Sequence, residues 1–123
     1  MFTISTEPGP GYLRFLVAGP AGVHETCAGA AFCAELLRRT SSRRVLLDMM
    51  TFAPVFARAD GLDVLSTLYG EMPALERLAV LIPAGKSHGI VLEVARHRNV
   101  PAREFDDPEE AAAWLTETVP LER

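Results

Sequence analysis

Apolar residues along this chain fall into short runs that alternate with stretches of helical periodicity. The bulky runs predict strands at residues 2–5, 12–18, 44–50, 78–82 and 100–105. Apolar residues spaced three or four apart predict helices at residues 23–39, 60–70 and 86–98. Strands separated by helices of this length imply parallel crossovers within one helix-covered sheet.

Glycine and proline mark the ends of the first strands. The sequence Glu-Pro-Gly-Pro-Gly at residues 7–11 predicts the turn of an antiparallel hairpin, and Gly-Pro-Ala-Gly at residues 19–22 is expected to end the second strand. The runs at residues 45–47 and 78–82 lack alternation, as is typical of strands covered on both faces. The predicted order is ββαβαβαβα, an α/β fold with a mixed sheet of four to five strands and four helices.

The last helix has the clearest local signal in the chain. Asp107 stands at the N-cap position, Pro108 at the first helical position, and Glu109 and Glu110 in the first turn. An N-cap carboxylate accepts hydrogen bonds from free amides, proline fixes φ, and acids oppose the helix dipole. The apolar residues that follow are expected to pack on the sheet: Ala111, Ala112, Trp114 and Leu115.

Length, composition and charge narrow the class of protein. The 123 residues are expected to form one domain, residues 1–123, and 49% hydrophobic content suffices for one core. The net charge of −4 argues against nucleic-acid binding, which needs a positive face. No apolar run approaches the roughly 20 residues of a transmembrane segment, and the first residues lack the pattern of a secretion signal. We therefore expect a cytoplasmic protein.

Two groups of side chains have a structural explanation. Cys27 and Cys33 lie six residues apart in a predicted helix, so their thiols face different sides and are expected to be buried and reduced. Cations that gather at one helix-to-strand turn are expected to stabilise the helix end, with docking of an acidic partner as the alternative. These cations are Arg38, Arg39, Arg43 and Arg44.

No catalytic or metal constellation stands out. His24 and His88 lie at predicted helix starts after strands, the edge of an open α/β sheet that faces ligands. With Asp48 they would make an acid–base group or a weak metal site, but no paired ligand spacing supports either. Surface or capping roles are the alternative. We expect no catalytic residue, no metal and no cofactor, and hence no enzyme.

A weak anion site is predicted at Gly85, Lys86 and Ser87, which follow a predicted strand and begin a predicted helix. A nucleotide-binding P-loop would also need a glycine where Val80 stands. The remaining hypothesis is a single anion on the helix N-terminus.

The segment from Met49 to Gly61 is unusually apolar for a loop. Three interpretations remain open: core packing, a surface for a protein partner or a second copy of the chain, and a pocket for a small lipophilic ligand. The candidate ligand or partner residues are Met49, Met50, Phe52, Phe56, Asp60 and Tyr69.

Three stretches of the chain carry a resemblance to a known fold. They are Arg-Val-Leu-Leu-Asp at residues 44–48, Leu-Ala-Val-Leu-Ile at 78–82, and the closing stretch 103–115, which runs from Arg-Glu-Phe-Asp-Asp-Pro-Glu-Glu through Ala-Ala-Ala to Trp-Leu. With the element order, they resemble the STAS and SpoIIAA-like fold, and above all small stand-alone bacterial SpoIIAA-like proteins. The resemblance covers nearly the whole chain and implies the fold more than any activity.

The resemblance also implies where a phosphorylation switch would stand. In anti-sigma-factor antagonists of this fold, a loop after the central strand reads Asp-Ser-Ser-Gly-Leu, and its first serine is phosphorylated. The corresponding residues here are 58–62, Arg-Ala-Asp-Gly-Leu, so Ala59 replaces the phosphoserine and has no hydroxyl to modify. Asp60 is expected at the N-cap of the next helix, with a fixed negative charge as the alternative.

The sequence thus favours a non-enzymatic binding or regulatory module of the bacterial cytoplasm that lacks the phosphorylatable serine. It would act through residues 49–61 and the helix that follows. The alternative, which the resemblance also suggests, is a carrier of a small lipophilic ligand or lipid, or a membrane-associated binding protein. The expected partner is an unknown protein, a second copy of the chain, or a lipophile.

Overall fold

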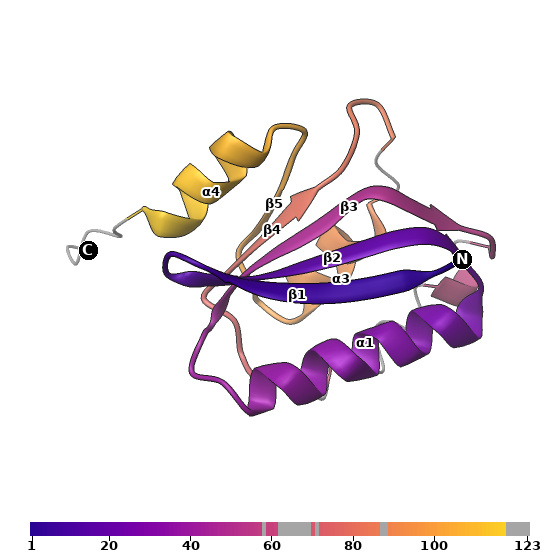
Figure 1. Ribbon diagram of the computed structural model, residues 1–123, viewed down its shortest axis with the longest axis horizontal. Helices are drawn as coiled ribbons and strands as arrows, with labels where there is room; N and C mark the ends of the chain where they lie inside the picture. The colour runs from indigo at the N-terminus through magenta and orange to yellow at the C-terminus, as the bar shows by residue number, and fades with distance from the viewer. Residues whose placement is uncertain (58, 62–69, 71, 87–88, 118–123) are drawn as a thin grey trace.

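The computed structural model describes residues 1–57, 59–61, 70, 72–86 and 89–117. Within them lies a five-stranded sheet in the order β1-β2-β3-β4-β5 (Figure 1). β1 and β2 are antiparallel, and each later strand is parallel to the one before it. The strands are β1 (Thr3–Gly9), β2 (Tyr12–Ala21), β3 (Arg44–Pro54), β4 (Arg77–Leu81) and β5 (Ala102–Phe105). The predicted α/β class, mixed sheet and N-terminal hairpin are confirmed.

The hairpin is tighter than the sequence indicates. Residues 7–9 do not belong to the turn, because Glu7 pairs with Arg14 and Gly9 pairs with Tyr12. The turn is the pair Pro10–Gly11, where Gly11 has φ +84°, a value that glycine adopts without strain. The predicted five-residue turn was therefore wrong, because two residues are enough to reverse the chain.

β2 and β3 also run further than predicted. Gly19 and Pro20 do not end β2, since they pair with Phe52 and Ala53 of β3. Gly19 has φ +92°, and a Cβ there would collide with the Met1 carbonyl, so glycine lets the N-terminal residues lie against the strand. Much of the predicted loop is consequently the second half of β3, which ends at Pro54.

Helices cover both faces of the sheet. α1 (Val23–Arg38) and α3 (Ile90–His97) lie on one face and α4 (Pro108–Thr116) on the other (Figure 1). The larger core lies on the α1 side and joins Leu37 to Val45 and Val91. The smaller core joins Leu46 to Leu115 of α4. α3 is shorter than the predicted 86–98, because its N-cap is Gly89 and its first helical residue is Ile90.

The helix ends are capped much as the sequence indicates. The Asp107 side chain accepts a hydrogen bond from the Glu109 amide at 3.1 Å, and Pro108 begins α4 as predicted. At the end of α1, the Arg43 guanidinium donates to the carbonyls of Leu37 and Thr40. The other arginines of this turn have partners too, which are Glu35 for Arg38 and Arg39, and Glu76 for Arg44.

Candidate functional site

An apolar cavity of about 110 Å³ lies between α1 and the sheet face that α1 covers. The strands supply Ile4, Phe15 and Val45, and α1 supplies Ala30 and Cys33. Among the described lining residues Thr26 alone carries a hydroxyl, and that hydroxyl is already bonded to the Gly22 carbonyl at 2.8 Å. The described wall therefore offers a ligand apolar contacts and no free side-chain hydroxyl.

β3 contains a register shift at Met49 and Met50, two residues of the predicted ligand or partner surface. Leu16 pairs with Asp48 but Ala18 pairs with Thr51, so β3 has one extra residue at this point. Met49 is 8% exposed and lines the cavity, whereas Met50 is 38% exposed and does not line it. Successive strand residues face opposite sides, and the extra residue allows Met49 and Phe52, three positions apart, to line the same cavity.

Aromatic rings form another part of the cavity wall. Phe52 and Phe56 both line it, as the sequence-based pocket hypothesis requires. The Phe2 ring meets the Phe52 ring edge-on, with 6.4 Å between the ring centroids. A Cβ on Gly61 would collide with the Phe56 ring, so this glycine makes room for it. The two phenylalanines of the predicted surface therefore lie together, but they face inward.

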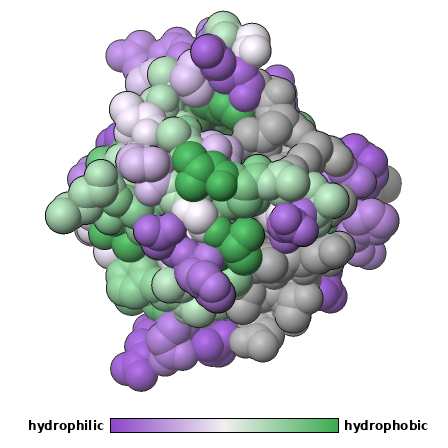
Figure 2. Space-filling model, turned by 90° about the vertical axis from the view of Figure 1, so that its right-hand side faces the viewer, coloured by the Kyte–Doolittle hydropathy of each residue, from purple (hydrophilic) through white to green (hydrophobic). Residues whose placement is uncertain are grey.

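Of the remaining residues of the predicted surface, Met50 and Asp60 do not line the cavity. Asp60 is exposed, and Tyr69 lies outside the described residues. Figure 2 shows apolar side chains on the surface at the end of the molecule where β3 ends, and Val55, just after that strand, is 65% exposed. The predicted surface is therefore divided between an internal wall and an exposed end.

Residues 59–61 are helical, which places Ala59 at the start of a helix. The Gly61 amide donates to the Ala57 carbonyl at 3.1 Å, so the helix begins before Asp60. The predicted N-cap role of Asp60 was therefore wrong, and its carboxylate instead lies in the first turn, where a negative charge still opposes the dipole. Ala59 carries no hydroxyl at this position.

Cys33 is buried in the wall of the cavity, as predicted, whereas Cys27 is only half-buried. Burial raises the pKa of the Cys33 thiol to about 12, because the apolar surroundings disfavour the thiolate. The thiol is therefore neutral at physiological pH and contributes a small apolar contact rather than a nucleophile.

A second hollow, of about 260 Å³, lies at the carboxyl ends of β3 and β4. Its lining includes Thr51, Ile82 and Lys86. The predicted anion site contributes Lys86 here, but the Lys86 amide donates to the Pro83 carbonyl at 3.0 Å and α3 begins only at Ile90. Gly85 sits in the turn with φ +76°, and Ser87 lies outside the described residues.

The structure does not bring together Asp48 and His24, the two described members of the suggested acid–base group. Asp48 is 4% exposed, and Arg14 Nη2 donates to its Oδ2 at 2.5 Å. The Met50 amide donates to its other oxygen at 3.2 Å. His24 is exposed on α1, which covers the opposite face of the sheet, and His88 lies outside the described residues. Asp48 therefore serves as the partner of Arg14.

Within the described residues no group of three His, Cys, Asp or Glu side chains is placed to hold a metal ion. The described helices also include none that is both long and apolar enough to cross a membrane.

Sequence reasoning missed the side of the cavity formed by α1 and the N-terminal residues. Gly29 lies so close to Phe2 that a Cβ would sit 3.1 Å from the ring. Nothing in the sequence of α1 indicates that space is left beside Ala30.

Comparison with known proteins places the chain by its fold. No protein-family model and no curated protein sequence matches it. An uncharacterized protein of the DUF3478 family with a SpoIIAA-like fold from Shewanella loihica superposes with a TM-score of 0.62 at 17% identity, covering 93% of each chain. An anti-sigma factor antagonist from Mycobacterium paratuberculosis superposes with a TM-score of 0.67 at 13% identity, covering 95% of this chain and 96% of that one.

Proposed function

Since the chain has the STAS or SpoIIAA-like fold, we propose that it is a non-enzymatic binding module whose cavity takes up a small lipophilic group. The observation that carries the proposal is the apolar cavity of about 110 Å³ between α1 and the sheet. Apolar ligand surface that moves from water into such a cavity contributes roughly 25 cal/mol per Å² to the free energy of binding. The proposal favours the lipophile alternative of the sequence analysis over the protein-partner interpretation.

The size of the cavity limits the ligand. An engineered apolar cavity of about 150 Å³ holds one benzene molecule. The cavity here, at about 110 Å³, therefore suits a short alkyl chain or one small ring and not a whole lipid. A larger lipophile would place only its end inside.

The chemistry of the buried polar groups supports a binding role rather than catalysis. The Asp48 carboxylate already pairs with Arg14, and the high pKa of Cys33 keeps its thiol neutral. Ala59 further supports a module without the phosphorylation switch of the antagonists.

Ala30→Leu tests the proposal, because the added carbon atoms occupy the cavity that Ala30 lines. We expect 1-hexanol to bind the wild type and to bind the variant about tenfold more weakly, the loss of about two buried methylene groups. Isothermal titration gives the affinities, and native mass spectra of freshly purified protein report any ligand that co-purifies.

Ala31→Leu is the matched control, since Ala31 is exposed on the same helix and the change in composition is identical. It should leave the affinity for 1-hexanol unchanged. Equal affinity in all three proteins, or no binding by the wild type, would refute the proposal.

A protein partner is the second candidate function. The structural likeness to an anti-sigma factor antagonist and the exposed side chain of Val55 favour it. Phe52 and Phe56 are poor positions to test it, because both line the internal cavity. The same native mass spectra test whether the chain self-associates. A mass of two chains without added ligand would favour the partner interpretation, with a second copy of the chain as the partner.

A further inference from the structure

The apolar cavity and the second hollow are neighbours that share a wall. Met49, Phe52 and Pro54 line both of them. The first space is lined by apolar side chains, and the second lies at the carboxyl edge of β3 and β4, where Thr51 and Lys86 add polar groups. Methionine has a flexible side chain that adapts to its neighbours, so among the three shared residues Met49 changes its side-chain conformation most readily.

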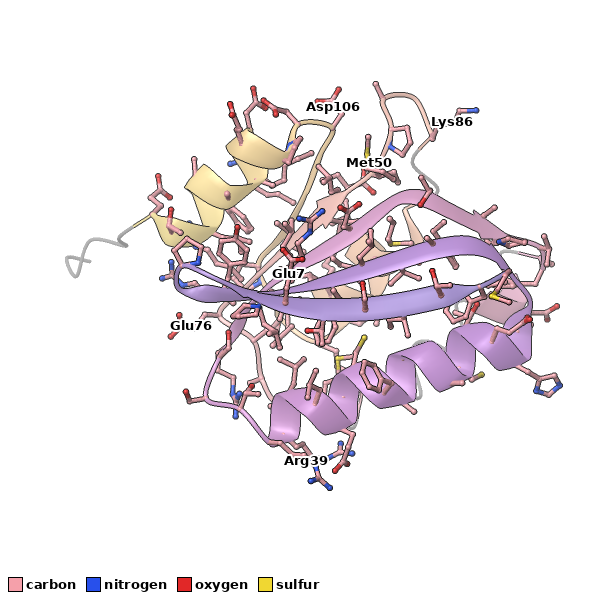
Figure 3. All side chains as sticks on the ribbon, viewed as in Figure 1. Glu7, Arg39, Met50, Glu76, Lys86 and Asp106 are labelled. Carbon is pink, nitrogen blue, oxygen red and sulfur yellow. The ribbon has the colours of Figure 1, made fainter. Side chains whose placement is uncertain are left out.

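The second hollow carries a positive charge. Lys86 is the only charged residue among its described lining residues, and Thr51 adds an exposed hydroxyl. The Lys86 side chain makes no hydrogen bond or ion pair within the described part of the chain, and only its backbone amide is occupied. Figure 3 shows Met50 and Lys86 at the same edge of the sheet, with the Lys86 amine in the open.

We propose that the ligand is a carboxylate amphiphile, with its alkyl tail in the apolar cavity and its carboxylate beside Lys86 and Thr51. This inference rests on the proposed function and specifies its ligand class. A single ammonium group matches a single negative charge, and the hydroxyl of Thr51 donates a hydrogen bond to the same carboxylate. Because the hollow is open, the carboxylate stays hydrated and does not incur the cost of a buried charge.

The protein carries a net charge of −4, so its overall field repels anions. A preference for a carboxylate over an alcohol with the same alkyl tail must therefore come from a local cation. An exposed ion pair changes affinity by about two- to fivefold. The tail adds about fourfold for each methylene group that it buries, until the cavity is full.

The test compares heptanoate with 1-hexanol, which carry the same six-carbon tail, by isothermal titration at low ionic strength. Wild-type protein should bind heptanoate about threefold more tightly than 1-hexanol. Lys86→Gln should abolish this preference, Lys86→Glu should reverse it, and Lys86→Arg should preserve it. Lys86 is exposed, so these variants should fold, which far-ultraviolet circular dichroism checks.

Arg96→Glu is the matched control for charge. Arg96 is exposed in the last turn of α3, which leads into β5, and the Leu78 amide at the start of β4 bonds to Pro101 just before β5. Arg96 therefore lies toward the amino edge of these strands, opposite the edge that holds Lys86. This variant should keep the preference for heptanoate.

The two proposals fail in different ways. If 1-hexanol binds and Ala30→Leu weakens it, but heptanoate binds no more tightly or keeps its advantage in Lys86→Gln, the carboxylate inference is wrong and the lipophile proposal stands. If neither compound binds the wild type, both are wrong.

Discussion

Single residues decide how the two faces of the sheet differ. Along β3, Val45 and Leu47 line the cavity, whereas Leu46 packs under α4 and Asp48 pairs with Arg14. Arg14 Nε is buried without a hydrogen-bond partner in the described structure, and the guanidinium charge is compensated by Asp48 at 2.5 Å and by the more exposed Glu7 at 3.8 Å. Removing only one member of such a charge pair costs more stability than replacing both members.

Asp48→Asn should destabilise the protein by about 2–3 kcal/mol, because the Arg14 charge loses its buried partner at a partly buried site, and the Glu7 carboxylate is exposed and 3.8 Å away. Urea unfolding at neutral pH measures the free energy. The double variant Asp48→Asn with Arg14→Met should recover part of the loss, since it removes the Arg14 charge as well. A single variant as stable as the wild type would contradict a structural role for the pair.

The Cys33 thiol makes stability depend on pH. Its pKa is about 12 in the folded protein against 9.0 for an unperturbed thiol, so above pH 9 the unfolded chain releases this proton first. Stability is therefore fully present below pH 9 and declines from there up to about pH 12. At pH 10 the loss should be about 1.4 kcal/mol.

Cys33→Ala isolates that contribution from other groups that titrate in the same range. The difference in unfolding free energy between wild type and variant should shrink between pH 8 and pH 10. A difference that stays constant across this range would show that the thiol ionises equally in both states.

At the scale of elements, the sequence predicted most where the signal is local. The start of α4 was correct because Asp107, Pro108 and the following acids act within one turn. The ends of β2 and β3 were wrong because they depend on contacts distant in sequence. Gly19 and Pro20 look like strand breakers until Met1 and Phe52 are seen beside them.

Asp107→Ala should destabilise the protein by about 1 kcal/mol, the usual cost of losing an N-cap side chain. Thermal or urea unfolding measures it. Asp106→Ala is the control, because Asp106 is an exposed neighbour of the same charge that does not cap the helix. Equal effects of the two changes would mean that charge, and not the hydrogen bond to the Glu109 amide, stabilises α4.

At the scale of the whole molecule, the sequence indicated the ingredients of the site but not its assembly. Met49, Phe52 and Phe56 were singled out, and all three line the cavity. Their inward direction depends on the register shift in β3, which no local pattern reveals. Lys86 lines a hollow that shares Met49 and Phe52 with the cavity, and this arrangement depends on how the turn after β4 sits beside β3 in the folded sheet.

The strand order β1-β2-β3-β4-β5 repeats the order of the strands along the chain. In the described sheet each pairing is thus between consecutive strands, and none of these strands has to insert between two earlier ones. A chain emerging from the ribosome meets the edge that each new strand needs already in place, and domains do fold during synthesis from the N-terminal side. If strands are added in this order, the sheet forms from the β1 and β2 side first. The part of the cavity wall that belongs to β1, β2 and α1 can then form before Lys86 has been translated.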